Sequence, residues 1–402
     1  MKYISTLFAT GALALLGLNA QAQAPITING QLAASEVATN GYQLVGRFTN
    51  PHGFGDAGLL ALYAASDANN LYFFIAGTLE NNTGGVSNSL QLFIDRPGST
   101  PGVPVGTILP AGGANTSFAN TTIKLDLAAD MAIGIKGTGT GNQVQVDGVV
   151  YTSSTAATGG VLTGTTPLNT TGTAGTITAA NAPGNLAPFV GSQVAYTSSA
   201  NLSSNPGFST TTPGNAPSNG LEIAVSRSAI GLPTAGGTVQ IFALQNNSGG
   251  GYLSSDFIPQ NNAAIPTTLG YPLPNLGGPS NGTPNAVDFA NIPGTQAASL
   301  NVTATNLTVT SNRAKAEAVA LNVYPNPVQG EATVTYRVQN AQQQVNIELT
   351  DLMGRRVSTV FAGQQGVGVQ SQKLGAGNVA AGTYLVKVQV GEQVATHKVT
   401  LL

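Results

Sequence analysis

The chain has 402 residues, of which only 7% are charged, against about 25% in an average soluble domain. A net charge of −2 with 14 basic residues excludes the electrostatic attraction on which nucleic-acid binding depends. The absence of cysteine excludes disulfides, thiolate metal sites and cysteine nucleophiles, and the 42% hydrophobic content argues against intrinsic disorder.

The N-terminus predicts an export signal. Lys2 supplies a positive charge, an apolar run follows over Leu7–Leu18, and the Ala-Gln-Ala at residues 20–22 fits a signal-peptidase cleavage site. We therefore expect residues 1–22 to be a signal peptide and the mature chain to begin at Gln23. The apolar run is too short to span a membrane, and no later stretch reaches about 18 uninterrupted apolar residues, so no transmembrane segment is expected.

Residues 23–311, the passenger, are predicted to be rich in β-strands. The runs Leu59–Ala65, Leu71–Ala76 and Ser89–Asp95 are separated by turns rich in Asn, Asp and Gly, which tolerate the positive φ of tight turns. We expect the three runs to form an antiparallel meander. Period-two alternation divides the third run between two faces, with Leu90, Leu92 and Ile94 on one and Gln91, Phe93 and Asp95 on the other.

Later runs predict further strands. Asp147-Gly148, between two Val-rich runs, is expected to be a two-residue hairpin turn. Leu221–Val225 alternates apolar with polar residues, so Glu222 is expected to face outward, and Ser226–Leu232 is compatible with one helical turn. Many strands without a sustained 3.6-residue period favour an all-β fold, with a large antiparallel β-sandwich as the passenger.

The composition changes after a predicted linker at residues 312–320. Residues 25–311 contain five basic and eleven acidic residues, a net charge of −6, whereas residues 321–402 contain six basic and four acidic residues, a net charge of +2. This change of density and sign indicates a domain boundary. Residues 321–402 are predicted to form a small Ig-like β-sandwich from the strands Leu321–Tyr324, Ala332–Val338, Val345–Leu349, Thr383–Val390 and Gln393–Leu401.

Three motifs give residues 321–402 a family resemblance. Residues 321–327 are Leu-Asn-Val-Tyr-Pro-Asn-Pro, residues 351–357 are Asp-Leu-Met-Gly-Arg-Arg-Val, and residues 381–388 are Ala-Gly-Thr-Tyr-Leu-Val-Lys-Val. Their order, spacing and C-terminal position resemble the type A C-terminal sorting domain of the type IX (Por) secretion system. The residues that carry the resemblance are Tyr324, Pro325, Asn326, Pro327, Asp351, Gly354, Arg355, Gly382, Tyr384 and Lys398.

This resemblance implies a route of export. The signal peptide takes the chain through the inner membrane, and the outer-membrane type IX translocon then recognises the folded C-terminal domain. A sortase-like peptidase removes that domain, and the passenger is attached to surface lipopolysaccharide or released. The implied location is extracellular, or on the outer-membrane surface of a Gram-negative bacterium. One departure is Leu401-Leu402, where many relatives carry a further basic residue.

The passenger more loosely resembles the carbohydrate-binding-module-9-like (DOMON-like) β-sandwiches. The segments involved are Ile28–Leu32 with Glu36, Asp67–Phe73, Ser89–Asp95 and Gly220–Val225. The resemblance implies a glycan-contacting face, and because the chain has no Trp, only Tyr and Phe can stack on a sugar. The candidate ligand-binding residues are Tyr72, Phe74, Phe93 and Asp95. The alternative places the three rings in the core, packed against the second sheet.

No catalytic constellation, cofactor or metal is expected. His52 follows Pro51 in a Gly-rich loop, so a solvated histidine is favoured over a general base. Asp67–Asn70 favours a hairpin turn over a calcium site, which needs six to eight oxygen ligands. Gly137–Gly141 precedes a strand rather than a helix, so a turn is favoured over a phosphate loop.

Two interpretations of the passenger stay open. The first is a non-catalytic glycan-binding or adhesive module displayed on the cell surface. The second is a structural surface or matrix protein without a specific ligand. A glycan-active hydrolase is a third and less favoured interpretation. The expected partners are the type IX translocon and its peptidase, with lipopolysaccharide and glycans following from the first interpretation.

Overall fold

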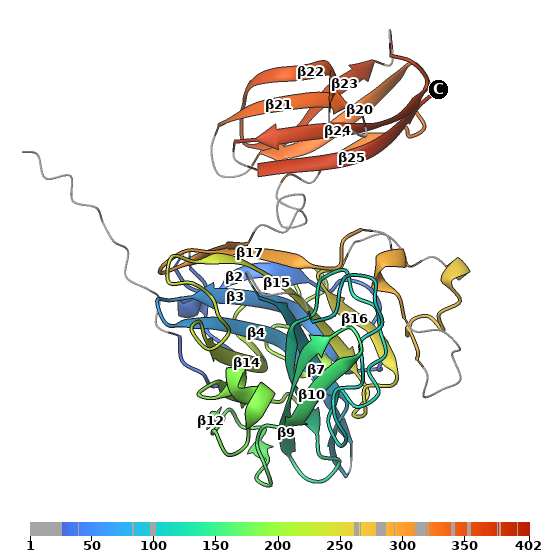
Figure 1. The fold of residues 1–402 in the computed structure, drawn as a ribbon. Coiled ribbons are helices and arrows are strands. Elements are labelled where there is room, and N and C mark those ends of the chain that lie inside the picture. Colours follow the sequence, from blue (N-terminus) through green and yellow to red (C-terminus); the bar gives the residue numbers. More distant parts are fainter. Residues whose placement is uncertain are drawn as a thin grey trace, which may run out of the picture.

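The computed structural model describes residues 26–38, 40–82, 84–96, 102–260, 265, 267–278, 287–292, 294–309, 319, 321–338, 342–351, 355–375, 377, 379–391 and 393–402. Strands dominate these residues, and the neighbouring strands of each sheet are antiparallel (Figure 1). This confirms the predicted all-β class. The predicted signal peptide and most of the predicted linker lie outside the described residues.

The passenger contains two large sheets and one small hairpin. The first sheet consists of β1 (Gln31–Leu32), β2 (Gln43–Arg47), β3 (Gly58–Ser66), β4 (Asn70–Thr78), β12 (Gly175–Thr176), β13 (Gln193–Tyr196) and β14 (Ser218–Ser226). The second consists of β7 (Ser89–Asp95), β8 (Met131–Gly137), β9 (Gln143–Ser153), β10 (Ala156–Val161), β11 (Leu168–Asn169), β15 (Gly237–Asn246), β16 (Leu253–Ile258), β17 (Ala298–Val302) and β18 (Leu307–Val309). The hairpin joins β5 (Glu80–Asn82) to β6 (Gly85–Ser87), and the short 3-10 helices are η1 (Ala34–Glu36), η2 (Gly184–Phe189), η3 (Leu202–Ser204), η4 (Thr267–Leu269) and η6 (Phe289–Asn291).

Both large sheets contribute to one hydrophobic core. Phe73 and Ile75 of β4 and Leu92 and Ile94 of β7 belong to this shared cluster. The opposite faces are also covered, because Phe74 lies in a second cluster and Phe93 in a third. The alternation predicted for Ser89–Asp95 is therefore correct, although the strand is buried on both sides rather than on one.

The predicted three-strand meander is wrong in its third member. β3 and β4 pair as expected. β7 instead pairs with β8 and β15 in the second sheet, and the β5–β6 hairpin lies between β4 and β7 in the sequence. The chain therefore changes sheets after β4.

Asp147-Gly148 is not a turn but lies inside the continuous strand β9. The glycine is favoured by packing, since a Cβ on Gly148 would lie only 2.6 Å from Cδ1 of Leu162, which would have to shift. Asp147 is buried and accepts a hydrogen bond from the Ser117 amide at 2.7 Å, and burial raises the pKa of this carboxyl to about 6. The hairpin turn instead joins β8 to β9 and contains the Gly-Thr-Gly-Thr-Gly segment that was predicted to be a turn.

The C-terminal domain has its own core between two small sheets. One sheet consists of β19 (Asn322–Tyr324), β20 (Glu331–Val338) and β23 (Gly368–Gly375). The other consists of β22 (Arg356–Gln365), β21 (Gln343–Thr350), β24 (Gly382–Val390) and β25 (Gln393–Leu401). Val319 is fully buried in this core, which therefore begins two residues before the predicted boundary. No helix among the described residues has the length and hydropathy of a membrane span.

Candidate functional site

The three motifs of the C-terminal domain meet at one end of its four-stranded sheet. Thr350, at the end of β21, lies opposite Leu385 near the start of β24. Gly382, which begins β24, lies opposite Leu401 at the end of β25. Strand pairing therefore brings together the motifs at residues 351–357 and 381–388, and the side chain of Asn326 joins the motif at residues 321–327 to β25 at the same end.

Asn326 attaches the Pro-Asn-Pro segment to the edge strand β25. Its amide nitrogen donates to the Lys398 carbonyl, and its amide oxygen accepts from the Thr400 backbone N–H, both at 2.9 Å. Pro325 and Pro327, which flank it, have no N–H to offer, so the side chain of Asn326 supplies the donor that pairs with the sheet edge. Both prolines are exposed, as are Lys398 and Tyr324, the latter to 52%.

The other two motifs close turns at the same end. The Asp351 carboxylate accepts from the backbone N–H of Arg355 at 2.9 Å and from its Nε at 3.0 Å. Gly354 lies outside the described residues. The Tyr384 hydroxyl donates to the Ala380 carbonyl at 2.9 Å. These motif residues therefore shape the end of the sheet, and the side chains at residues 324, 325, 327 and 398 are exposed beside them.

Residues 322–401 match the family model of the secretion system C-terminal sorting domain. Residues 322–401 are therefore a type IX secretion sorting domain, as the three motifs indicated. This domain supports export of the chain by type IX secretion to the cell surface.

The comparisons say little about the passenger. A comparison with curated proteins finds no match. Among solved structures, dimeric latent PorU from Porphyromonas gingivalis is similar over 92% of this chain and 35% of its own, at 13% identity and a TM-score of 0.19. The chain spans about a third of the length of that protein, and this likeness is too low to carry an argument about fold or function.

The four side chains predicted to form a glycan-contacting face do not share one. Tyr72 and Phe74 belong to β4 in the first sheet, whereas Phe93 and Asp95 belong to β7 in the second. Phe74 and Phe93 are fully buried. The alternative, that these rings belong to the hydrophobic core, is therefore correct for Phe74 and Phe93. Their rings lie in the clusters on the outward faces of the two sheets, however, so the predicted packing against the second sheet is wrong.

Tyr72 and Asp95 are half-buried, and the Tyr72 hydroxyl is already hydrogen-bonded. The Tyr72 hydroxyl donates to Oδ2 of Asp67 at 2.6 Å, and burial together with this carboxylate raises the pKa of Tyr72 to about 12. Oδ1 of Asp67 accepts the backbone N–H groups of Asn69 and Asn70, both at 2.7 Å, which confirms the hairpin turn. Burial, and then the nearby charge of Asp130, raises the pKa of Asp95 to about 6.

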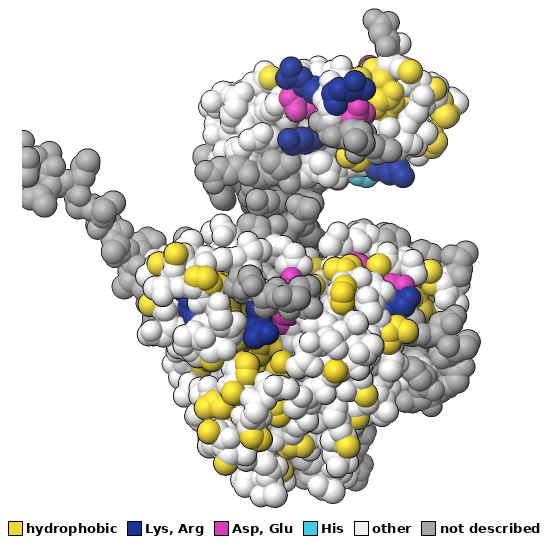
Figure 2. Space-filling view, viewed as in Figure 1, with side chains coloured by type: hydrophobic (Ala, Val, Ile, Leu, Met, Phe, Trp, Pro, Cys, Tyr) yellow, Lys and Arg dark blue, Asp and Glu magenta, His cyan; other side chains and the backbone are white. Residues whose placement is uncertain are grey.

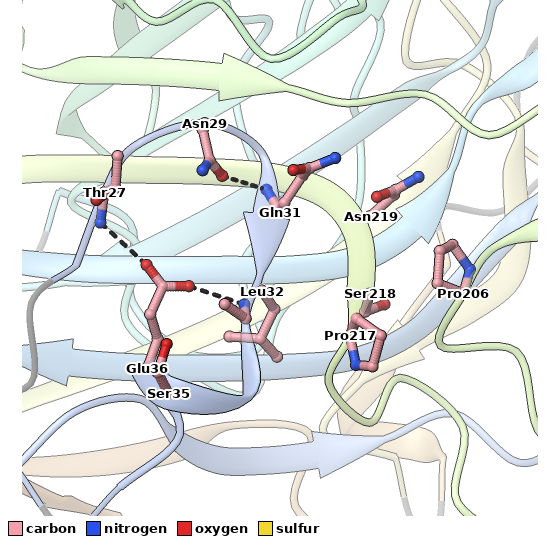
Figure 3. A pocket seen from close by; sticks show the side chains of 11 residues that line it. Thr27, Asn29, Gln31, Leu32, Ser35, Glu36, Pro206, Pro217, Ser218 and Asn219 are labelled. Atoms are coloured by element: carbon pink, nitrogen blue, oxygen red, sulfur yellow. Dashed lines mark hydrogen bonds between the residues drawn. The ribbon is translucent and has the colours of Figure 1, made fainter.

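A different site appears where the N-terminal segment crosses the first sheet (Figure 3). It is a pocket of about 460 Å³ between residues 27–36 and the start of β14. Its hydrogen-bonding side chains are Thr27, Asn29, Gln31, Ser35, Glu36, Ser218 and Asn219. Its apolar wall consists of Leu32, Ala33, Pro206 and Pro217. No Lys, Arg or His is among the described residues that line it.

Two buried carboxylates hold the N-terminal segment that forms one wall of this pocket. Glu36 accepts the backbone N–H groups of Thr27 at 3.0 Å and Ala33 at 2.8 Å, one on each oxygen. Glu222 accepts those of Asn29 at 2.8 Å and Gly30 at 2.9 Å. The two carboxylates therefore accept backbone N–H groups of the N-terminal segment that have no partner strand to bond with.

Glu222 has the predicted outward orientation, but it is fully buried, so its expected exposure to solvent is wrong. It does point away from the shared core, but the N-terminal segment covers it, and the Tyr42 hydroxyl donates to its Oε1 at 2.8 Å. Burial raises the pKa of Glu222 to about 7, against the lowering effect of its hydrogen bonds, and the negative charge of Glu36 adds to the rise.

His52 is not a solvated loop residue. Its side chain is 22% exposed, and Nδ1 lies 2.5 Å from Oδ2 of the fully buried Asp256. Asp256 also accepts the backbone N–H of Gly53 at 3.1 Å and the Ser254 hydroxyl at 2.7 Å. The pair fastens the loop before β3 to β16. Among the described residues, including His52 and Asp256, no three His, Asp or Glu side chains lie close enough to hold a metal ion.

Proposed function

We propose that the passenger is a non-catalytic glycan-binding or adhesive module that acts at the cell surface after type IX export. The observation that supports this proposal is the pocket beside β1 and β14, whose wall combines neutral amides and hydroxyls with two proline rings. Amides and hydroxyls donate and accept hydrogen bonds, as do the hydroxyls of a sugar. The proline rings offer apolar contact to the C–H groups of the sugar ring.

The charges in the pocket favour a neutral ligand and no catalysis. No cation lines the described part of the pocket, so an anionic ligand would have no charge partner there. Both oxygens of Glu36, the carboxylate in the lining, accept backbone N–H groups. A hydrolase that used two carboxylates would need them free on either side of the scissile bond.

A glycan microarray probed with the mature full-length protein tests this proposal. We expect saturable binding to neutral glycans, reduced at least fivefold by Gln31→Ala, because this exposed amide lines the pocket. Gln193→Ala is the matched control, since Gln193 is also an exposed glutamine on a strand of the first sheet and lies outside the pocket. Absence of binding to every glycan, or equal effects of the two variants, would contradict the proposal.

The alternative of a structural surface protein is supported by the scarcity of charge on the passenger. Figure 2 shows that the visible face of the passenger consists mainly of backbone and uncharged side chains, with scattered hydrophobic side chains and few acidic or basic ones. The microarray also tests this alternative, which predicts no saturable ligand.

For the export route, we propose recognition by the outer-membrane translocon, followed by removal of the sorting domain by a sortase-like peptidase. Deletion of residues 319–402 is expected to leave the passenger in the periplasm, as measured by fractionation and immunoblotting. The deletion begins at Val319 because this residue belongs to the core of the domain. Normal display of the truncated chain on the cell surface would refute the route.

A further inference from the structure

Phe54 and Tyr252 form a stacked aromatic pair on two adjacent loops of the passenger. Their ring centroids are 6.0 Å apart and the rings are only 12° from parallel. Both side chains are half-buried. In every other ring pair of the described residues at least one ring is buried, so this pair is the one that keeps both rings partly accessible.

The loop that carries Phe54 is held rigidly. The neighbouring His52 binds Asp256, and the Gly53 backbone N–H donates to the same carboxylate. A Cβ on Gly53 would lie 2.1 Å from Oδ1 of Asn275, so the backbone at this glycine packs tightly against the next loop. Phe54 is therefore fixed in its half-exposed position by the residues before it.

Tyr252 is fixed in the same way. Its backbone N–H donates to the Asn246 side chain at 3.3 Å, and its carbonyl accepts from the Asn247 N–H at 3.0 Å. Its hydroxyl makes no hydrogen bond with any described residue, and this leaves a donor and an acceptor for a ligand. Two aromatic rings held in place before binding lose little conformational entropy when a ligand stacks on them.

We propose that the stacked pair of Phe54 and Tyr252, called the aromatic platform, offers an outward ring face to the apolar face of a pyranose ring in a neutral glycan, while the other ring of the pair supports it from behind. Such rings present an apolar surface with a polar edge, and the Tyr252 hydroxyl suits that edge. The platform shares no lining residue with the pocket beside β1 and β14, so it is a second contact site. This inference rests on the proposed glycan binding and adds the class of contact that a chain without Trp can supply.

The test measures the affinity of the mature full-length protein for the strongest neutral glycan on the microarray by isothermal titration calorimetry, a readout that does not depend on the fluorescence of Tyr252. Tyr252→Ala and Phe54→Ala are each expected to weaken binding at least tenfold, whereas Tyr252→Phe keeps the ring and is expected to lose less than threefold. Tyr252→Leu keeps apolar volume but removes the aromatic face, and separates stacking from loop packing. Phe208→Ala is the matched control, because Phe208 is a 42% exposed phenylalanine on another loop.

The outcomes separate the platform from the pocket. Binding that is weakened by Gln31→Ala but unchanged by the variants at positions 54 and 252 overturns the platform and leaves the proposed function in place. Binding that is weakened by the platform variants alone supports the platform and contradicts the pocket. Equal losses in Tyr252→Leu and Tyr252→Phe would also refute stacking. Absence of binding to every array glycan overturns both proposals.

Discussion

Replacement of Glu222 by glutamine is expected to change how the stability of the passenger depends on pH. Glu222 is fully buried, and its pKa is raised from 4.5 to about 7, chiefly by burial. The folded state therefore holds this proton more tightly than the unfolded chain does. The resulting stabilisation is complete below pH 4.5 and is lost as the pH rises through about 7.

The size of the effect follows from the shift in pKa. A rise from 4.5 to about 7 corresponds to about 3 kcal/mol, since each pKa unit is worth about 1.4 kcal/mol. Most of this is lost between pH 5 and pH 8. Glutamine does not ionise but fits the same bonds, because its oxygen accepts from the N–H groups of Asn29 and Gly30 while its NH₂ donates to the Tyr42 oxygen.

Urea unfolding of the full-length wild type and Glu222→Gln, followed by near-UV circular dichroism, measures the difference. Wild-type stability relative to the variant should fall by about 2–3 kcal/mol from pH 5 to pH 8. Asp95 and Asp147, whose pKa values are raised to about 6, titrate in both proteins, so their contributions cancel in the difference between wild type and variant. Glu80→Gln, at a partly exposed glutamate of β5, is the control. A pH-independent difference, or one of opposite sign, would refute the reasoning.

Three further changes have defined expected outcomes. Arg227→Leu should lower the free energy of unfolding by about 3–5 kcal/mol in a urea titration. The buried guanidinium donates to the carbonyls of Asp67 and Ala304, which would lose this partner in the variant. A loss below about 1 kcal/mol would contradict this role. Asn326→Ala should destabilise the sorting domain by about 1–2 kcal/mol and speed hydrogen exchange at the Thr400 amide, with unchanged exchange as the opposing result. Gly148→Ala should lower the passenger's stability by about 1–3 kcal/mol in calorimetry, because the new methyl group would overlap the side chain of Leu162. An unchanged melting temperature would contradict this expectation.

Local patterns in the sequence predicted individual strands well. The alternation in Ser89–Asp95 correctly assigned Leu92 to one face and Phe93 to the other, because the two-residue period of a strand depends only on neighbours. Strand pairing depends on distant residues and was not predictable in this way. Leu92 lies opposite Ala243, and nothing in the sequence around either residue specifies the other.

The candidate site shows the same limit. The alternation around Glu222 correctly indicates that its side chain points away from the shared core. Its burial comes from Asn29 and Gly30, which lie 193 and 192 residues earlier in the chain. Burial by residues so distant in the chain leaves no pattern in the sequence around Glu222. The pocket that the N-terminal segment forms was therefore not predicted.

In the sorting domain, the motifs identified the family, but the strands β22 and β23 were not predicted. Their sequences carry many Gln, Gly and Ser residues, which weaken the apolar alternation by which a strand is recognised. Only the pairing of β22 with β21, and of β23 with β20, defines them. The motif residues were easier to find because their identities are set by bonds at one end of a sheet.

The arrangement of the hydrophobic cores has a consequence for proteolytic maturation. The last described strand of the passenger, β18, pairs with β17 and ends at Val309. The core of the sorting domain begins at Val319. A single peptide bond broken between these two residues would leave all the described residues of each core on one side of the cut. Processing at the cell surface would therefore divide one polypeptide into two folded products without unfolding either of them.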